Sequence, residues 1–180
     1  MKNILVLLFS HIFIHCFAPV IVLERIHIPE PCIYEIIESE AGITLPSWVE
    51  KTHIEFMYEK AIEFDIPLRI MFRLVYNESR YKFDVVSPVG AYGYMQIMPE
   101  TYKYILNMIE YPECTEHTPF VNIELGVRYL AYLKRFWQGR GYDGWEYPLA
   151  SYNAGVGRVL KAGGIPNIPE TINYVAFINQ

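Results

Sequence analysis

The residue best suited to acid–base chemistry is a glutamate near the end of a predicted helix. The segment 67–79, PLRIMFRLVYNES, begins with a proline at a first-turn position. Its apolar residues recur with the spacing of one helix face, at Ile70, Met71, Leu74 and Val75. One further turn brings Glu78 onto that face, where partial burial and the negative end of the helix dipole both disfavour a carboxylate. The spacing therefore predicts a raised pKa for Glu78 and a proton that can be donated near neutral pH.

An ordinary role for Glu78 remains open at this point. The side chain could turn to solvent at a fraying helix end, or it could pair with Arg80 two residues further on. A functional role therefore depends on what the neighbouring segment provides.

That segment, residues 87–99, reads SPVGAYGYMQIMP and has neither helical nor strand periodicity. Gly90 and Gly93 allow a close approach of the backbone to a ligand. Hydrogen-bonding groups and soft apolar contacts come from Ser87, Gln96, Met95 and Met98. These residue types suit the wall of a ligand groove. They also suit a turn-rich loop whose methionines fill gaps in a core, and composition leaves both interpretations open.

Most of the remaining chain carries helical patterns. Besides 67–79, we predict helices over residues 46–66, 99–110, 122–139, 145–155, 156–164 and 169–179. Asn122 is the expected N-cap of the longest one, and KFDVVS, residues 82–87, is the only strand candidate. The patterns predict a mainly α fold, a compact bundle of about six to eight helices with little or no β-structure.

Composition limits the size and the partners. With 180 residues, 52% apolar and 19% charged, the chain has room for one domain with a proper core. A formal net charge of -5 argues against binding nucleic acid. Metal and nucleotide sites are not expected, because His27, His53 and His117 lack ligand spacing and the glycine-rich segment 153–164 lacks the GK[ST] of a phosphate loop. We predict no cofactor.

The N-terminus has the pattern of an export signal. Residues 1–18 carry one lysine followed by a largely apolar run, which is typical of a secretory signal peptide. The run over 4–23 is also long enough for an uncleaved membrane anchor. Residues 19–45 contain three prolines and no sustained period, so they are interpreted as an extension or linker before the domain at 46–180.

Two cysteines, Cys32 and Cys114, follow the predicted signal. An even count in an exported chain is compatible with a disulfide. Two free thiols are equally compatible with the sequence, so both states remain open.

Four blocks, in order, resemble the soluble lytic transglycosylase family of the lysozyme-like superfamily. They are ESRYKFDVVSPVGAYGYMQIMPETY (78–102), NIELGVRYL (122–130), ASYNAG (150–155) and PETINYV (169–175). Members of this family cleave the glycan strands of peptidoglycan, so the resemblance implies a lysozyme-like fold with a glycan-binding groove. Tyr94 departs from the leucine that is usual in the family, which could alter the groove surface.

The resemblance also implies roles for individual residues. Glu78 matches the single catalytic acid and base. The positions that match the lining of the site are Ser87, Gln96, Met98 and Tyr152, with Asn153 beside Tyr152 and with Glu170 and Tyr174 in the last block. The implied reaction breaks the bond between N-acetylmuramic acid and N-acetylglucosamine without water and leaves a 1,6-anhydromuramoyl end.

Two other functions remain open. A hydrolytic muramidase of the lysozyme type needs a second carboxylate, for which Asp84 is the candidate. A catalytically idle subunit would instead bind peptidoglycan for a secretion system or a phage particle. A single domain behind a signal also fits an enzyme that works with secretion or conjugation machinery. We expect a monomer, exported to the periplasm or cell envelope.

Overall fold

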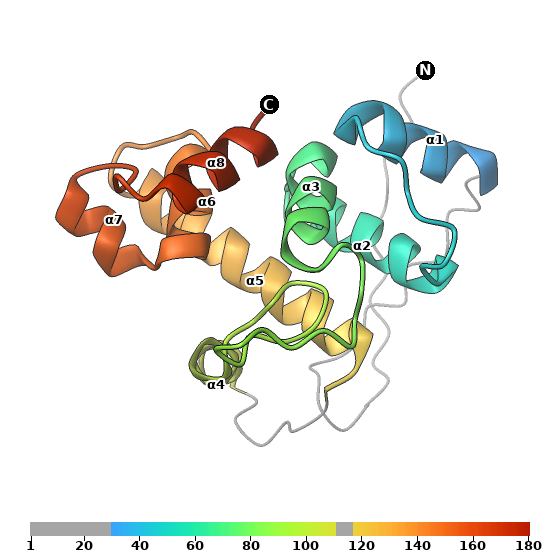
Figure 1. The fold of residues 1–180 in the computed structure, drawn as a ribbon, viewed down its shortest axis with the longest axis horizontal. Helices are drawn as coiled ribbons and strands as arrows, with labels where there is room; N and C mark the ends of the chain where they lie inside the picture. Colours follow the sequence, from blue (N-terminus) through green and yellow to red (C-terminus); the bar gives the residue numbers. More distant parts are fainter. Residues whose placement is uncertain (1–29, 111–116) are drawn as a thin grey trace.

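A computed structural model describes residues 30–110 and 117–180. Within these residues the chain forms eight helices (Figure 1), which are α1 (Glu30–Ala41), α2 (Lys51–Glu63), α3 (Leu68–Ser79), α4 (Pro99–Met108), α5 (Pro119–Gln138), α6 (Glu146–Ala154), α7 (Val156–Ala162) and α8 (Pro169–Ile178). β-structure in the described residues is limited to isolated bridges from Tyr92 to Val86 and to Ile97. The predicted mainly α fold is therefore confirmed, and the strand candidate 82–87 supplies only one bridge residue.

Helix α5 is the longest element and crosses the molecule diagonally (Figure 1). Helices α6, α7 and α8 gather at one of its ends, and α1, α2 and α3 gather toward the other. Helix α5 packs against α2, α4 and α6, whereas α3 packs against α1, α2 and α8. Through its contact with α8, helix α3 links the two groups.

The predicted apolar face of α3 is confirmed. Ile70, Met71, Leu74 and Val75 have no solvent exposure. Burying a side chain of this kind contributes about 1.5 to 3 kcal/mol. The helix that carries Glu78 is therefore firmly fixed over its length.

Helix α1 lies within the segment that the sequence presented as an extension or linker. Ile37 and Ala41 are fully buried, and α1 packs against α2 and α3. The Arg73 side chain on α3 donates to the carbonyls of Ala41 (2.5 Å) and Phe177 (2.9 Å), which joins α1 to α8. Residues 30–41 are thus part of the folded unit. The helix was missed because its apolar face extends over only three turns and follows a proline-containing segment.

Two predicted helix starts are corrected. Helix α2 begins at Lys51 rather than at residue 46, because a turn from Pro46 to Val49 precedes it. Trp48 is consequently 67% exposed instead of lying on the apolar face.

Asn122 is not an N-cap but lies inside α5. The cap is Thr118, whose hydroxyl accepts from the backbone N–H of Val121 at 3.2 Å, and Pro119 occupies the first turn. This proline and threonine form the stronger start signal.

In the part of the chain that the structure describes, no helix is long and apolar enough to cross a membrane. The predicted signal (1–18), the candidate anchor (4–23), Cys114 and the side chain of Cys32 lie outside the described residues. The export signal remains a prediction, and the two states of Cys32 and Cys114 that the sequence allows both stay open.

Candidate active site

Glu78 is the penultimate residue of α3 and is partly buried. The helix ends after Ser79 because Arg80 adopts the left-handed conformation, with φ of 53°. The Arg80 guanidinium donates to the carbonyl of Tyr76 at 2.8 Å and lies 4.2 Å from the centre of the Tyr76 ring. Arg80 is therefore held by Tyr76, and the alternative pairing with Glu78 is not formed.

The direct partner of Glu78 is Tyr174, a buried residue of α8. The Tyr174 hydroxyl donates to Glu78 Oε1 at 2.5 Å. A neutral hydroxyl stabilises a carboxylate less than a cation would, and it leaves the carboxyl group able to take up a proton.

The surroundings raise the pKa of Glu78 to about 7. Burial is the largest cause, because it disfavours the charged form. The hydrogen bond from Tyr174 opposes the rise, and the negative charge of Glu170 adds to it. The predicted rise is confirmed, and burial is one of the two causes that the sequence indicated, the other being the negative end of the helix dipole. Near neutral pH the group exists in both protonation states, as a residue that first donates and then accepts a proton must.

Tyr152, on α6, brings a second hydroxyl to this region. It donates to the carbonyl of Met95 at 2.8 Å. Burial and then the charge of Glu78 hold the pKa values of Tyr152 and Tyr174 well above the usual range. Both hydroxyls therefore keep their protons. The fold thus gathers one carboxyl and two phenols from α3, α6 and α8.

Residues 87–98, which we call the site loop, are held against α5 by Asn122. Its amide group donates to the carbonyl of Tyr92 and accepts from the N–H of Met95, both at 2.9 Å. Gly93 has φ of +80°, and a Cβ there would lie 2.5 Å from Asn122 Cγ. The absence of a side chain at Gly93 therefore leaves space for the Asn122 side chain.

Ser87 and Gln96 shape the site loop itself. The Gln96 side chain donates to the carbonyls of Val85 (3.1 Å) and Gly93 (3.0 Å). The Ser87 hydroxyl oxygen accepts from the N–H of Ala91 at 2.9 Å. Both residues are partly exposed, so each also has atoms that can face a ligand.

The apolar residues of the site loop divide between core and surface. Met95 is fully buried and Tyr94 is 4% exposed, so neither lines a groove. Met95 instead packs in the core, which is the second of the two interpretations that the sequence left open. Met98, which directly precedes α4, is partly exposed and is the methionine that can contact a ligand.

Asn153 joins two of the helices that supply the site. Its side-chain oxygen accepts from the hydroxyl of Thr171 at 2.7 Å, which ties α6 to α8. This contact fixes Tyr152 relative to Tyr174, so Asn153 supports the two phenols.

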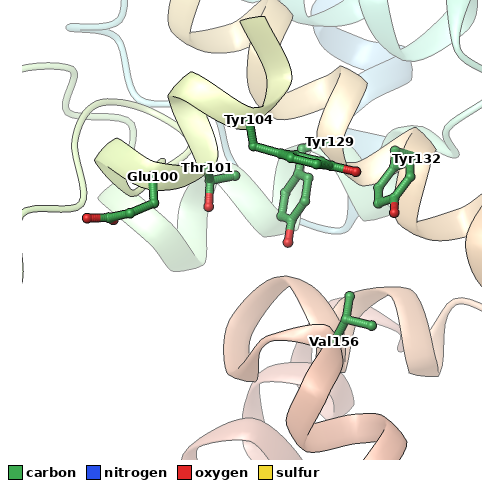
Figure 2. Close-up of a pocket in the computed structure, with 6 residues that line it drawn as sticks. All are labelled: Glu100, Thr101, Tyr104, Tyr129, Tyr132 and Val156. Carbon is green, nitrogen blue, oxygen red and sulfur yellow. The ribbon is translucent and has the colours of Figure 1, made fainter. Parts of the chain in front are cut away.

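A tyrosine-lined pocket adjoins this region (Figure 2). It has a volume of about 330 Å³ and is lined by Glu100, Thr101, Tyr104, Tyr129, Tyr132 and Val156. In Figure 2 the hydroxyls of Tyr129 and Tyr132 point from α5 toward the start of α7 across the opening. The ring of Tyr129, which lines the pocket, lies 5.5 Å from the ring of Tyr152, measured between ring centres.

Sequence reasoning missed the pocket and the role of Asn122. Tyr129 and Tyr132 stand three residues apart on the helix predicted over 122–139. This spacing is a signal that could have indicated an aromatic surface. In the described residues no group of three His, Cys, Asp or Glu side chains could hold a metal ion. The expected absence of a cofactor remains a prediction.

Comparison with known proteins places these features in context. Residues 55–175 match the family described as the transglycosylase SLT domain. The soluble lytic murein transglycosylase of Escherichia coli K12 is 35% identical over 121 residues, which are 64% of this chain and 18% of the relative. The chain therefore spans about a fifth of the length of the curated relatives that it matches.

Two solved structures share the fold. The 70-kDa soluble lytic transglycosylase of Escherichia coli matches with a TM-score of 0.59 and 27% identity, over 69% of this chain and 22% of the other. An inactive glutamate-to-glutamine mutant of the lytic transglycosylase Slt from Pseudomonas aeruginosa matches with a TM-score of 0.62 and 26% identity, over 83% of this chain and 26% of the other.

Proposed function

The chain belongs to the transglycosylase SLT family, and from this premise we propose that it is a lytic transglycosylase that cleaves the glycan strands of peptidoglycan. The observation that carries the proposal is the state of Glu78. Its pKa is raised to about 7 by burial, and its direct partner is a neutral tyrosine. The solved relative that is inactive through a glutamate-to-glutamine change supports a glutamate as the reacting group in this fold.

In the proposed reaction Glu78 acts twice. The protonated carboxyl donates its proton to the oxygen that bridges N-acetylmuramic acid and N-acetylglucosamine, and the bond from that oxygen to the anomeric carbon breaks. The N-acetyl group of the muramoyl sugar stabilises the positive charge that develops. The Glu78 carboxylate then takes the proton of the muramoyl 6-hydroxyl as its oxygen bonds to the anomeric carbon. The product is a 1,6-anhydro end, and no water is consumed.

The surrounding residues position the reacting groups. The Tyr174 hydroxyl orients the Glu78 carboxyl through its hydrogen bond, and positioning of this kind supplies a large part of a rate enhancement. Ser87, Gln96, Met98 and Tyr152 contact the sugar next to the scissile bond, while Asn153 holds Tyr152 in place. The tyrosine-lined pocket receives a further sugar of the strand, because it combines ring faces with hydroxyl groups.

One carboxylate is sufficient in this mechanism, whereas hydrolysis by two carboxylates needs a second one beside the first. Asp84, the sequence candidate for that role, is exposed, and the carboxylate whose charge acts on Glu78 is Glu170. Export to the periplasm or cell envelope, a monomeric state and a link to secretion or conjugation machinery complete the proposal.

The test is a digestion of purified peptidoglycan, with the released muropeptides identified by mass spectrometry. The wild type should release 1,6-anhydromuramoyl products. Glu78→Gln should reduce the rate by a factor on the order of 1,000 or more, because it removes the only acid and base of the mechanism.

Asp84→Asn is the matched control. It should leave the rate and the products unchanged. Products heavier by one water, lost in Asp84→Asn, would replace the proposal with the hydrolytic muramidase. Binding to peptidoglycan without products from the wild type would replace it with the idle binding subunit.

A further inference from the structure

A histidine of α2 and a tyrosine of the site loop form a buried polar pair. His53 on α2 is 6% exposed and Tyr94 in the site loop is 4% exposed. His53 Nδ1 lies 3.0 Å from the Tyr94 hydroxyl. Both rings pack among aromatic neighbours, since Phe120 lies 5.1 Å from His53 and Phe83 lies 5.5 Å from Tyr94, measured between ring centres. The pair is therefore a directional contact among aromatic rings.

The direction of this hydrogen bond follows from the second ring nitrogen. His53 Nε2 faces the carboxylate of Glu50 at 3.7 Å, and a carboxylate only accepts hydrogen bonds. The proton of a neutral imidazole is therefore favoured on Nε2, which leaves Nδ1 to accept from the Tyr94 hydroxyl.

The charges near the pair leave this arrangement intact at neutral pH. Burial lowers the pKa of His53, although Glu50 opposes this, so the ring is neutral. Burial, Glu50 and Asp84 together raise the pKa of Tyr94 to about 12, so its hydroxyl keeps the proton that it donates.

Tyr94 is directly followed by the residue that connects the site loop to the active site. The Met95 carbonyl accepts from the Tyr152 hydroxyl at 2.8 Å, and the Met95 N–H donates to Asn122 at 2.9 Å. The position of Met95 is therefore fixed from α6 and α5 by its own backbone, and from α2 through the side chain of Tyr94.

We propose that His53 and Tyr94 are positioning residues. Their hydrogen bond holds the site loop in the position where the Met95 carbonyl accepts the hydrogen bond from the Tyr152 hydroxyl. Neither residue touches the reacting atoms. When the bond is lost, the site loop shifts or fluctuates, and Tyr152 loses its fixed orientation beside Glu78. The effect on catalysis rests on the proposed function, whereas the effect on the loop does not.

The loop position can be measured without any substrate. Tyr94→Phe keeps the ring and removes the hydroxyl. Amide hydrogen exchange, followed by NMR, should be about fivefold faster or more at Met95 in this variant, because one buried hydrogen bond is lost locally. The amide of Leu133, inside α5, is the internal reference and should exchange at the wild-type rate.

Tyr81→Phe is the matched control for loss of a buried phenol. Its hydroxyl donates to the carbonyl of Phe72 at 2.8 Å, on α3. It should lower the unfolding temperature without a selective change at Met95. His53→Leu removes the acceptor and should reproduce the exchange result of Tyr94→Phe, and the double variant should exchange no faster than either single variant.

Turnover of peptidoglycan supplies the second readout. Tyr94→Phe should lower kcat about fivefold and leave KM within about twofold, since the contact orients the site without binding glycan. In a Tyr152→Phe background the same change should have no further effect, because the contact through which it acts is already absent.

Unchanged exchange at Met95 would overturn the proposal, whatever the activity. Faster exchange together with wild-type kcat would also overturn it, because the bond would then be merely structural. The third outcome is faster exchange at Met95 in Tyr94→Phe while the wild type releases no muropeptides. This outcome would contradict the proposed function and would still support the role of the pair in holding the site loop.

Discussion

Glu78 and Glu124 are two carboxylates that the fold withdraws from water, and they differ in their partners. Glu124, on α5, is 5% exposed and lies between two cations, with Lys60 Nζ at 2.7 Å and Arg128 Nε at 2.5 Å. Glu78 receives one hydrogen bond from the neutral Tyr174 and lies near a second acid, Glu170. The first arrangement, which we call the charged tie, consists of Glu124, Lys60 and Arg128 and joins α2 to α5 through ion pairs. The second arrangement keeps a proton available on Glu78.

The contrast shows that burial alone does not make a glutamate a catalyst. A buried carboxylate with cations beside it forms ion pairs and serves the structure. Without a cation, the same burial raises the pKa toward neutrality, where the group can donate and accept a proton. Four substitutions each remove one of the interactions that distinguish the two carboxylates.

The largest effect on stability is expected at the charged tie. Glu124→Gln leaves Lys60 and Arg128 without their common anion and should lower the free energy of unfolding by about 3 kcal/mol. Urea denaturation followed by circular dichroism measures this loss. Well below the unfolding temperature the folded variant should turn over peptidoglycan at the wild-type rate. A large loss of kcat in fully folded protein would show that the two carboxylates are not independent.

Glu78→Gln should change the free energy of unfolding in the opposite direction and raise it. Because the pKa of Glu78 rises from 4.5 to about 7 on folding, the folded state binds this proton more tightly than the unfolded chain does. The resulting stability is fully present below pH 4.5 and is lost as the pH rises through about 7. A neutral amide avoids this loss. At pH 8 the variant should be more stable than the wild type by about 1 to 2 kcal/mol, allowing for the partial exposure of Glu78.

The comparison at pH 4 is the control for this variant. Glutamic acid and glutamine are both neutral there, so the two proteins should unfold at nearly the same denaturant concentration. A variant that is less stable than the wild type at pH 8 would mean that the ionised Glu78 is well accommodated and that its role as an acid is wrong.

Tyr174→Phe removes the neutral hydrogen-bond partner of Glu78. The hydrogen bond from Tyr174 lowers the pKa of Glu78, so its removal should raise that pKa further. The alkaline limb of the profile of kcat/KM against pH should move upward by about 0.5 to 1 pH unit, because the acid stays protonated to higher pH. A downward shift would contradict the assigned role of the hydroxyl.

Glu170→Gln should give the smallest effect, a shift of the profile of kcat/KM against pH in the direction opposite to that of Tyr174→Phe. Its charge raises the pKa of Glu78, but Glu170 is exposed, and solvent and salt screen the interaction. The alkaline limb should therefore move downward by about 0.3 pH unit. The shift should shrink further in high salt, whereas the shift in Tyr174→Phe should not.

Features set by local spacing could be predicted from the sequence. The apolar face of α3, the position of Glu78 on it and the starts of α4 and α8 at prolines follow from residues within a few turns of one another. The raised pKa of Glu78 followed from the same local pattern. The resemblance of the four sequence blocks to a known family indicated the fold as a whole.

Features set by distant partners could not be predicted. Asn122 was taken for a helix cap, since the two loop backbone groups that it binds lie 27 and 30 residues earlier in the chain. The packing of Gly93 against Asn122 and the hydrogen bond of Tyr94 with His53 were not predicted for the same reason, because Asn122 and His53 come from other parts of the chain. Side-chain spacing shows which face of a helix is apolar, but it does not show which residue will pack there.

The hydrogen bond between Glu78 and Tyr174 also has a consequence for the order in which the protein becomes competent. The two residues are 96 positions apart in the chain, and contacts of such separation form late, after the long loop between them has closed. During synthesis the acid emerges well before its partner. A chain that lacks α8 therefore holds Glu78 without the hydroxyl that orients it. Packing of α8 is the step that completes the site around Glu78.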